Sequence, residues 1–385
     1  MQILTKLWKW LRGAALPVWV GLNVLVAGIT VFSGWGGNID PMKMPFAGVA
    51  NLTFPIWFSL SALLLIVDLI LCRWASIAPL AAILATLKPF LVFCPLNFGS
   101  HQVKPEEENR AFKVLSYNIL SFVDETGLSD SDCNRTMEYI LQADADVVAL
   151  LEYENQGPIA KFVPRAQLDS FRTVYPYHSL CSRGTALFSK RPILHIEPPF
   201  NTLSRSSIEA FRTQVAGRPV NIFAVHLESI GLNDDDKELY RDITDRKVVE
   251  DAEAFNVSEV RAQLIDKLYS AFRYRNEQAL YLRNYVEELG GDIIVCGDFN
   301  DVPGCRTIKI LEKTGLKDVY AEVGLGPTIT FALPHFIFRI DHVLYRGAMR
   351  PVSIERGNVR SSDHYPMLTT FVWDEDTTPQ RGTND

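Results

Sequence analysis

The chain has 385 residues, more than one ordinary domain, and a formal net charge of −7. Residues 1–104 carry seven Lys or Arg and two Asp, which leaves 31 basic and 43 acidic residues, a net charge of −12, for the rest. Such an acidic part argues against nonspecific binding of nucleic acid, which relies on several Lys and Arg contacts to phosphates. The six cysteines show no spacing typical of a metal site and no pairing that the sequence predicts.

Three apolar stretches occupy the first hundred residues, at 13–39, 46–72 and 74–98. The first is uncharged, the second contains only Asp68 near its end, and the third is interrupted by Lys88-Pro89. A stretch of this length can cross a hydrocarbon core of ~30 Å. A secretory signal peptide is the alternative for the first stretch, but its apolar region is usually shorter and a small-residue cleavage site should follow. We therefore expect residues 1–104 to form a retained transmembrane anchor of three helices.

The charges around these stretches predict the orientation of the chain. Lys6, Lys9 and Arg12 precede the first stretch, whereas the next loop offers only Lys43. The bias of basic residues toward the inner side of a membrane places the N-terminus in the cytoplasm. Three crossings of the lipid bilayer would then put the acidic part of the chain outside the cytoplasm, whereas two would leave it inside.

From residue 105 onward, strand and helix patterns alternate, which indicates layered α/β architecture. Ala216-Gly217-Arg218-Pro219 between two apolar runs predicts a hairpin, and Gly290-Gly291 ends a long amphipathic helix. The charged stretch 231–256 is predicted to be a solvated loop, with a lid over the site as the alternative. Strands are expected at 112–120, 146–151, 185–189, 193–196, 211–215, 220–225, 293–296, 337–345 and 367–373, and helices at 138–142 and 258–289.

The stretch Ile293-Ile294-Val295-Cys296-Gly297-Asp298-Phe299-Asn300 reads as a buried strand that stops at two polar side chains. Asp298 and Asn300 are two residues apart, so in extended backbone they would point the same way. A carboxylate and an amide at a strand end suit a site that handles a phosphate and a hard metal ion. A strand that simply ends in an Asx-turn is the alternative for so short a match.

Further stretches end in the same kinds of side chain. They are Val114-Leu115-Ser116-Tyr117-Asn118, Val147-Val148-Ala149-Leu150-Leu151-Glu152, Ile222-Phe223-Ala224-Val225-His226, Arg339-Ile340-Asp341-His342 and Ser361-Ser362-Asp363-His364-Tyr365-Pro366. In this order the motifs resemble the endonuclease/exonuclease/phosphatase superfamily, which includes deoxyribonuclease I, exonuclease III-type repair nucleases, neutral sphingomyelinases and inositol polyphosphate phosphatases. The resemblance covers about 112–373 and leaves the first hundred residues uncovered. The sequence departs from the inositol phosphatases, because no Pro-Trp-Cys precedes Asp341.

The resemblance implies a four-layer α/β sandwich, with two packed mixed sheets, outer helices and the site at one end of the sheets. We expect this catalytic domain over 105–374, followed by a disordered tail over 375–385. Hydrolysis of a phosphoester requires neutralised phosphoryl charge and an activated water. Glu152 is expected to hold Mg²⁺, or Mn²⁺ as a substitute, with Asn118 and Asp363 as further oxygen ligands.

The remaining site residues have expected catalytic roles. His364 would activate water or stabilise the attacked phosphoryl group. The resemblance assigns Asp341 as the carboxylate that orients His364, Asp298 as the group that aligns or deprotonates the nucleophile, and Asn300 as an amide donor to a phosphate oxygen. It places His226 opposite His364, where it would protonate the leaving oxygen or bind the phosphate. His178, His195 and His342 have no such context and are predicted to be structural.

Three functions are compatible with these features. The first is a membrane-tethered phosphodiesterase that acts on a lipid head group or another small phosphodiester, which tethering and the acidic charge favour. The second is a tethered nuclease that acts on nucleic acid, and the third is an inactive membrane scaffold. Acyl transfer is not indicated, since no nucleophile elbow is present, and no phosphate-binding P-loop or zinc spacing appears.

Overall fold

The computed structural model describes residues 2–71, 73–99, 102–124, 127, 129, 133–155, 157–181, 183–197, 207–231, 257–332 and 338–375. The predicted tail beyond residue 375 and the charged stretch from 232 to 256 lie outside these residues. The chain divides into two compact units. The first comprises Met1–Leu96, Glu228–Tyr281 and Asn300–Lys313, and the second comprises Asn97–Leu227, Leu282–Phe299 and Thr314–Asp385.

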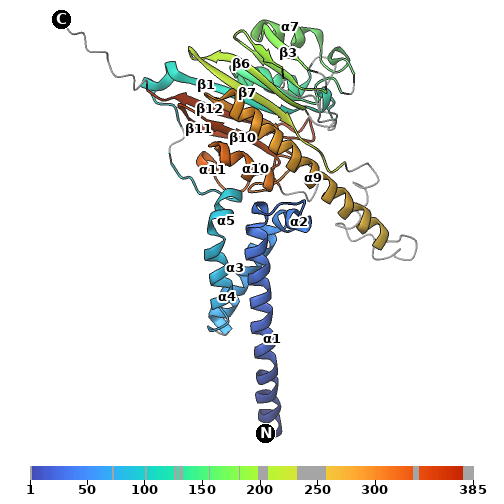
Figure 1. Cartoon of the computed structure of the whole chain (residues 1–385), viewed down its shortest axis with the longest axis vertical. Coiled ribbons are helices and arrows are strands. Elements are labelled where there is room, and N and C mark those ends of the chain that lie inside the picture. The colour runs from blue at the N-terminus through green and yellow to red at the C-terminus, as the bar shows by residue number, and fades with distance from the viewer. Residues whose placement is uncertain are drawn as a thin grey trace, which may run out of the picture. The chain divides into compact units, whose positions relative to one another are not determined.

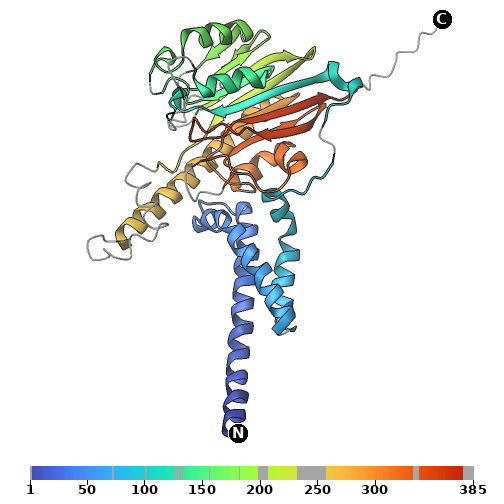
Figure 2. The ribbon, with the colours of Figure 1, turned by 180° about the vertical axis from the view of Figure 1, so that it is seen from behind.

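The first unit contains the apolar N-terminal helices. These are α1 (Gln2–Gly34), α2 (Phe46–Leu52), α3 (Phe54–Leu71), α4 (Ile77–Ala85) and α5 (Leu87–Phe93), and the unit also holds α10 (Arg306–Leu311) and part of α9 (Val257–Leu289). Helices α1, α3 and α4 contact one another and run side by side (Figures 1 and 2). Among the residues that the structure describes, two segments are long and apolar enough to cross a membrane, Leu16–Gly34 of α1 and all of α3.

The third apolar stretch, which contains Lys88-Pro89, is divided into two short helices. It forms α4 and α5, separated at Thr86, and neither helix alone has the length of a membrane span. Pro89 explains the break, because proline has no N–H to donate to the carbonyl of Ala85 and its ring clashes with that group. The Ala85 carbonyl accepts instead from the indole Nε1 of Trp35 at 3.1 Å.

The apolar helices bury polar side chains and expose apolar ones. Asp68 of α3 is fully buried, and its Oδ1 accepts from Trp19 Nε1 at 2.6 Å. The hydroxyl groups of Thr30 and Ser61 are likewise buried, and their oxygens lie 2.7 Å apart. Large apolar side chains of α3 are exposed: Ile56, Leu63, Ile66, Leu69, Ile70 and Leu71. This arrangement is the reverse of that in a helix whose apolar face packs into a water-soluble core.

The first unit also includes segments from the acidic part of the chain. Arg306 Nη1 donates to the carbonyl of Asn38 at 3.1 Å. Gly37 lies so close to Gly304 that a Cβ on Gly37 would be 1.9 Å from the Gly304 oxygen.

The second unit contains two mixed six-stranded sheets. The strands are β1 (Ala111–Asn118), β2 (Val147–Leu151), β3 (Tyr177–Leu180), β4 (Ala186–Ser189), β5 (Leu194–Ile196), β6 (Ser207–Val215), β7 (Arg218–His226), β8 (Ile293–Asp298), β9 (Lys317–Asp318), β10 (Asp341–Arg346), β11 (Met349–Arg356) and β12 (Met367–Trp373). Their orders are β11-β12-β1-β2-β4-β3 and β5-β6-β7-β8-β10-β9. In each sheet one central pair is parallel, β1 with β2 and β7 with β8, and the other pairs are antiparallel.

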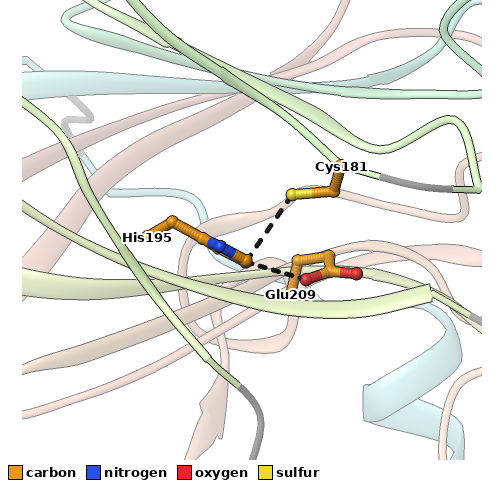
Figure 3. Close-up of side chains that lie close together, drawn as sticks. All are labelled: Cys181, His195 and Glu209. Carbon is orange, nitrogen blue, oxygen red and sulfur yellow. Dashed lines mark hydrogen bonds and ion pairs between the residues drawn. The ribbon is translucent and has the colours of Figure 1, made fainter. Parts of the chain in front are cut away.

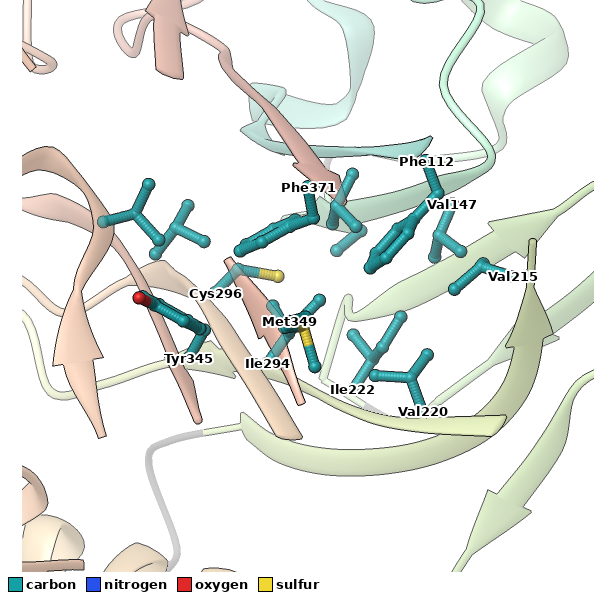
Figure 4. Close-up of a cluster of buried hydrophobic side chains, with 14 of the residues drawn as sticks. Phe112, Val147, Val215, Val220, Ile222, Ile294, Cys296, Tyr345, Met349 and Phe371 are labelled. Atoms are coloured by element: carbon teal, nitrogen blue, oxygen red, sulfur yellow. The ribbon is translucent and has the colours of Figure 1, made fainter. Parts of the chain in front are cut away.

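The two sheets pack face to face through a continuous apolar core (Figure 4). Phe112 and Phe371 from the first sheet meet Ile222 and Ile294 from the second, because alternate residues of each strand face inward. Helices α6 (Arg135–Ala143) and α7 (Arg165–Val174) pack on the outer face of the first sheet.

The C-terminal part of α9 covers the outer face of the second sheet. Tyr285 packs on Phe223 with ring centroids 5.0 Å apart, and the Val286 carbonyl accepts from Arg346 Nη2 at 3.1 Å. The order helices, sheet, sheet, helix confirms the predicted four-layer α/β sandwich.

Candidate active site

The polar side chains singled out in the sequence lie at one end of the two sheets. Asn118 is the last residue of β1, and Glu152 follows β2 directly. His226 and Asp298 are the last residues of β7 and β8 and lie opposite each other in the parallel pair. Asp341 begins β10 and faces Asp298 across the antiparallel pair. Parallel pairing thus brings the carboxyl ends of four strands together, as expected for a site at a sheet end.

Gly297 allows this approach. Its φ is +144°, and a Cβ at this position would lie 1.9 Å from the carbonyl oxygen of Val225 in β7. Only glycine fits without moving one of the two strands. The glycine of the central motif therefore sets the pairing that places Asp298 next to His226.

One carboxylate oxygen lies at the centre of the cluster. Asp298 Oδ2 accepts from Asn118 Nδ2 at 3.3 Å. The same oxygen lies 3.7 Å from His226 Nε2 and 3.5 Å from His364 Nε2. Asp298 is 1 % exposed, so its charge is held by polar neighbours in the place of bulk water.

Glu152 is the more accessible carboxylate of the cluster, with 24 % of its side chain exposed. Its Oε1 accepts from Asn118 Nδ2 at 3.0 Å and lies 3.8 Å from His226 Nε2. Glu152 has a φ of +55°, a left-handed conformation that costs energy for a residue with a side chain. Its carbonyl accepts from both the N–H and the hydroxyl of Ser121, at 3.0 and 2.9 Å, which helps to hold this conformation.

His364 is buried and held by Asp341. Its Nδ1 lies 2.9 Å from Asp341 Oδ2. Burial by itself lowers the pKa of His364, but the carboxylates of Asp341 and Asp298 outweigh burial and raise that pKa to about 10. The ring therefore carries a proton on each nitrogen, and it can donate toward Asp341 from one side and toward Asp298 from the other.

Two hydroxyl groups that the sequence reasoning did not single out support these residues. Thr330 Oγ1 accepts from the N–H groups of Ile340 and Asp341 at 2.9 and 3.0 Å. Ser362 Oγ donates to the Asn118 carbonyl at 2.8 Å and accepts from the His364 N–H at 3.2 Å. Ser362 directly precedes Asp363-His364 in the sequence, so its place in the motif was the available signal, whereas Thr330 had none.

The remaining observations on the predicted site residues concern Asn118, Asp363 and Asn300. The amide nitrogen of Asn118, and not its oxygen, faces Glu152, so Asn118 orients this carboxylate, and direct metal ligation would require the amide to rotate. Asp363 accepts from Ser362 Oγ at 3.3 Å and lies near enough to His364 to raise its pKa. Asn300 lies two residues beyond Asp298 with a φ of +52°, in the first compact unit.

The chemistry of the donor set fits a hard divalent cation. Glu152 offers a carboxylate that is partly open to solvent, and the nearby carboxylate of Asp298 adds negative charge. Mg²⁺ takes oxygen ligands, commonly one or two carboxylates, and keeps several waters. A partly exposed carboxylate beside a buried one meets this requirement.

Two sequence-family models match separate parts of the chain. The sequence model described as Endonuclease/Exonuclease/phosphatase family matches residues 115–364, and one described as a domain of unknown function matches residues 16–93. No curated protein matches the chain in sequence.

Several solved structures resemble the chain. An endonuclease/exonuclease/phosphatase from Beutenbergia cavernae is 20 % identical, with 69 % of this chain and 72 % of that one covered and a TM-score of 0.47. The human nocturnin catalytic domain is 16 % identical, with coverages of 69 % and 95 % and a TM-score of 0.41. Truncated TDP2 from Caenorhabditis elegans is 16 % identical, with coverages of 69 % and 99 % and a TM-score of 0.42.

Proposed function

The chain belongs to the endonuclease/exonuclease/phosphatase family, and from this premise we propose that it is a membrane-anchored phosphodiesterase that uses Mg²⁺. Members of the family are divalent-metal-dependent phosphoester hydrolases, so the reaction class follows from membership. The proposed substrate is a lipid head group or another small phosphodiester.

The observation that carries the proposal is the set of contacts around Asp298 Oδ2. Asn118, His226 and His364 all direct a nitrogen at this one oxygen, from three different strands or loops. A buried carboxylate at this position can accept a proton from a water, and a protonated imidazole beside it can stabilise negative charge on the phosphoryl group. These contacts support hydrolysis of a phosphoester as the reaction of this site.

Each residue has a role in the proposed reaction. Glu152 would hold Mg²⁺, which when bound neutralises charge on the phosphoryl oxygens. Asp298 orients the attacking water and takes its proton, and Asn300 donates its amide to a phosphoryl oxygen. His364, kept charged and oriented by Asp341, donates to the oxygens on which negative charge increases. Burial of Asp298 and His364 strengthens these interactions, because water competes less for the same groups.

The remaining residues complete the site. His226 is 21 % exposed and lies between Glu152 and Asp298, where it can donate a proton to the leaving oxygen. Asp363 would add an oxygen near the metal, through a bound water or directly. Asn118 keeps the carboxylates of Glu152 and Asp298 in place by donating to both.

The apolar helices support the membrane anchor. Lipid chains do not solvate polar groups, so a spanning helix turns Asp, Ser and Thr toward its neighbours and Leu and Ile toward lipid. Helix α3 has this pattern, with Ser61 and Asp68 buried against α1 and Leu69 and Ile70 exposed. A cleaved signal sequence would leave Asp68 without Trp19, its partner from α1.

Helices α4 and α5 together are proposed as the third crossing. Phe90 of α5 stacks on Phe58 with centroids 4.2 Å apart, and Phe93 packs on Phe54 at 5.5 Å. These partners lie in the first turns of α3, so the chain returns alongside α3 to the level where α3 began. If α3 crosses the bilayer, α4 and α5 cross it in the opposite direction. With the N-terminus in the cytoplasm, three crossings place residues after α5 outside.

The substrate proposal is tested with the purified full-length protein in detergent. The full chain is needed because the first compact unit combines the helices with segments on either side of β8. Sphingomyelin, other phospholipids, single- and double-stranded DNA, RNA and phosphomonoesters are compared with and without Mg²⁺. Metal-dependent hydrolysis of a phospholipid supports the proposal. Hydrolysis of nucleic acid alone would assign the chain to the nucleases, and no hydrolysis of any substrate would favour a scaffold.

A further inference from the structure

A second group of potential metal ligands lies at the edge of the two sheets and shares no residue with the active site. Cys181 follows β3, the edge strand of the first sheet, and His195 lies in β5, the edge strand of the second. Glu209 lies in β6, beside β5. Among the residues that the structure describes, these three and the Asp298, Asp341 and His364 group are the sets whose ligand atoms lie within 4.8 Å of one another.

The three side chains converge on one point (Figure 3). His195 Nε2 lies 3.6 Å from Cys181 Sγ and 2.9 Å from Glu209 Oε2. The other ring nitrogen, Nδ1, faces the carboxylate of Glu197 at 3.8 Å. A sulfur and a carboxylate oxygen thus approach the same nitrogen.

This geometry differs from that of a Cys–His–acid nucleophile. There the acid orients one ring nitrogen and the thiol uses the other, so the two groups lie on opposite sides of the imidazole. Here Cys181 and Glu209 lie on the same side of the imidazole, at Nε2, and the thiol also contacts the Glu209 carboxylate. Burial also raises the pKa of the Cys181 thiol to about 12, with the nearby carboxylate of Glu209 adding to the effect, which opposes a reactive thiolate.

A shared cation would satisfy all three groups. Ligands at about 2.0–2.3 Å from a tetrahedral zinc ion lie roughly 3.3–3.8 Å from one another. The S–N distance of 3.6 Å is in this range, and the N–O distance of 2.9 Å needs an outward shift of a few tenths of an ångström, which a rotation of the Glu209 side chain provides. Thiolate, imidazole and carboxylate together suit zinc, since Mg²⁺ and Ca²⁺ take oxygen ligands.

The surroundings hold the three side chains in place before any ion binds. The Cys181 N–H donates to the Thr185 carbonyl at 2.9 Å, and the Thr185 hydroxyl donates to Ser207 Oγ at 2.6 Å, a second contact between the two sheets. Glu209 is largely buried, with 12 % of its side chain exposed, while His195 is 27 % exposed. The group is thus preformed, and solvent reaches it.

We propose that Cys181, His195 and Glu209 bind one zinc ion that cross-links β3 of the first sheet to β5 and β6 of the second. Cys181 binds as the thiolate and its proton leaves to solvent, His195 binds through Nε2, and water takes the fourth position. Glu197 can then accept from the Nδ1 proton of His195 and fix the ring orientation. This zinc is separate from the catalytic Mg²⁺ and does not depend on the proposed substrate.

The test measures metal in the full-length protein, purified in detergent and loaded with zinc before gel filtration. Wild type is expected to retain about one zinc per chain. Cys181→Ser and Glu209→Gln should weaken zinc binding by at least about 100-fold, more than the loss of a group that only orients a ligand. Cobalt(II) in place of zinc should give a near-ultraviolet thiolate charge-transfer band, which Cys181→Ser abolishes.

Two control variants separate this site from other metal binding. The first control is Cys133, a partly buried thiol 3.6 Å from the Glu138 carboxylate. Cys133→Ser should retain zinc, which would show that a cysteine near a carboxylate is not by itself the zinc site. Glu152→Gln should also retain it, because it changes only the active site. Circular dichroism confirms that each variant is folded. The proposal is wrong if wild type retains no zinc, if both ligand variants retain it like wild type, or if only Glu152→Gln loses it.

Discussion

At the scale of single residues, the two carboxylates of the proposed site, Asp298 and Glu152, have different surroundings and different proposed roles. Asp298 is buried, and nitrogens of three residues lie near one of its oxygens. Glu152 is partly exposed, and of those three residues only Asn118 and His226 lie near it. A buried carboxylate with such neighbours suits proton transfer, and an exposed one can bind a hydrated cation.

Glu152→Gln tests the metal role. The amide keeps the shape of the side chain but removes the charge that attracts Mg²⁺, so activity should fall by roughly 10²–10³-fold, as expected for a loss of several kcal/mol. Titration with Mg²⁺ should show weaker activation, while thermal unfolding in the absence of metal stays close to that of wild type. Unchanged activation by Mg²⁺ would remove Glu152 from the metal site.

His364→Ala tests the catalytic imidazole. Loss of a group that transfers protons or stabilises charge should lower kcat by about 10²–10⁴-fold, with little change in the concentration of Mg²⁺ needed for half-maximal activity. His178→Ala is the control, because His178 of β3 stacks on Phe188 of β4 and its loss should affect activity little. Near-full activity of the His364 variant on the true substrate would contradict the assigned role.

At the scale of elements, the parallel pairs and the loop before β10 decide where the site forms. Most expected strands appear within a few residues of their predicted limits, and the predicted hairpin is confirmed as β6 and β7, joined by Ala216 and Gly217 at positive φ. The strand expected at 337–345 begins only at Asp341, and β3, β11 and α7 were not predicted. Strand β3 has a mostly exposed, polar sequence, so its periodicity gave no signal.

Gly297→Ala tests the pairing of β7 with β8. The added methyl group would meet the Val225 carbonyl at 1.9 Å, so the strands must separate at the point where His226 faces Asp298. We expect a loss of stability of at least about 3 kcal/mol, together with loss of activity, measured by thermal unfolding and turnover. In Gly217→Asn, where φ is also positive but space is open, stability should change by less than about 1 kcal/mol.

Asp318→Asn tests the ion pair that fixes the loop before β10. Arg339 donates to both carboxylate oxygens of Asp318, at 3.2 and 2.7 Å, two residues before Asp341. Burial by itself raises the pKa of Asp318, but Arg339 and His342 hold that pKa well below its usual range. Removing the charge leaves Arg339 buried and unpaired, so stability at pH 7 should fall by about 3–5 kcal/mol.

The sign of the pH dependence follows from the lowered pKa. The ionised form of Asp318 stabilises the fold above its unfolded pKa of about 3.9, and this stabilisation is lost as the pH falls further. The stability difference between wild type and Asp318→Asn should therefore shrink below about pH 4 in denaturant unfolding. Asp144→Asn, at the exposed pair with Lys190, should cost less than about 1 kcal/mol. A pH-independent difference would mean that charge is not the cause.

At the scale of the whole molecule, the proposed membrane anchor would set the compartment in which the reaction takes place. A phosphodiesterase outside the cytoplasm meets different lipids and metal concentrations from one inside. In the proposed topology, the number of crossings depends on α4 and α5, which are separated at Thr86. Phe90 and Phe93 of α5 pack on Phe58 and Phe54 at the start of α3.

A reporter fusion after Lys104 tests this topology. We expect alkaline phosphatase to be active there and a cytoplasmic fluorescent protein to be dark, because three crossings export the fusion point. Fusion after Arg73, which follows two crossings, should give the opposite pattern. A fluorescent and phosphatase-silent fusion after Lys104 would leave two crossings and a cytoplasmic site. The protein should also stay in membranes washed at high pH, with its N-terminus intact by mass spectrometry.

The sequence by itself determined the α/β class, the apolar N-terminal helices and the polar strand ends. Each of these features is encoded in a contiguous stretch of about four to twenty residues. The sequence alone predicts them because hydrophobic periodicity and the length of an apolar stretch are local properties. The same short stretches predicted a set of site residues, and the structure places them at one end of the sheets: Asn118, Glu152, His226, Asp298, Asp341 and His364.

Only the tertiary structure decided which distant residues share a partner. Cys181, His195 and Glu209 come from the edges of two different sheets, and Asp318 meets Arg339 across 21 residues. His195 was expected to be structural, and the cysteines showed no metal spacing, because ligands on separate strands need no fixed interval in the sequence. Their convergence depends on strand order and on how the sheets pack, and both are set by contacts between residues far apart in the chain.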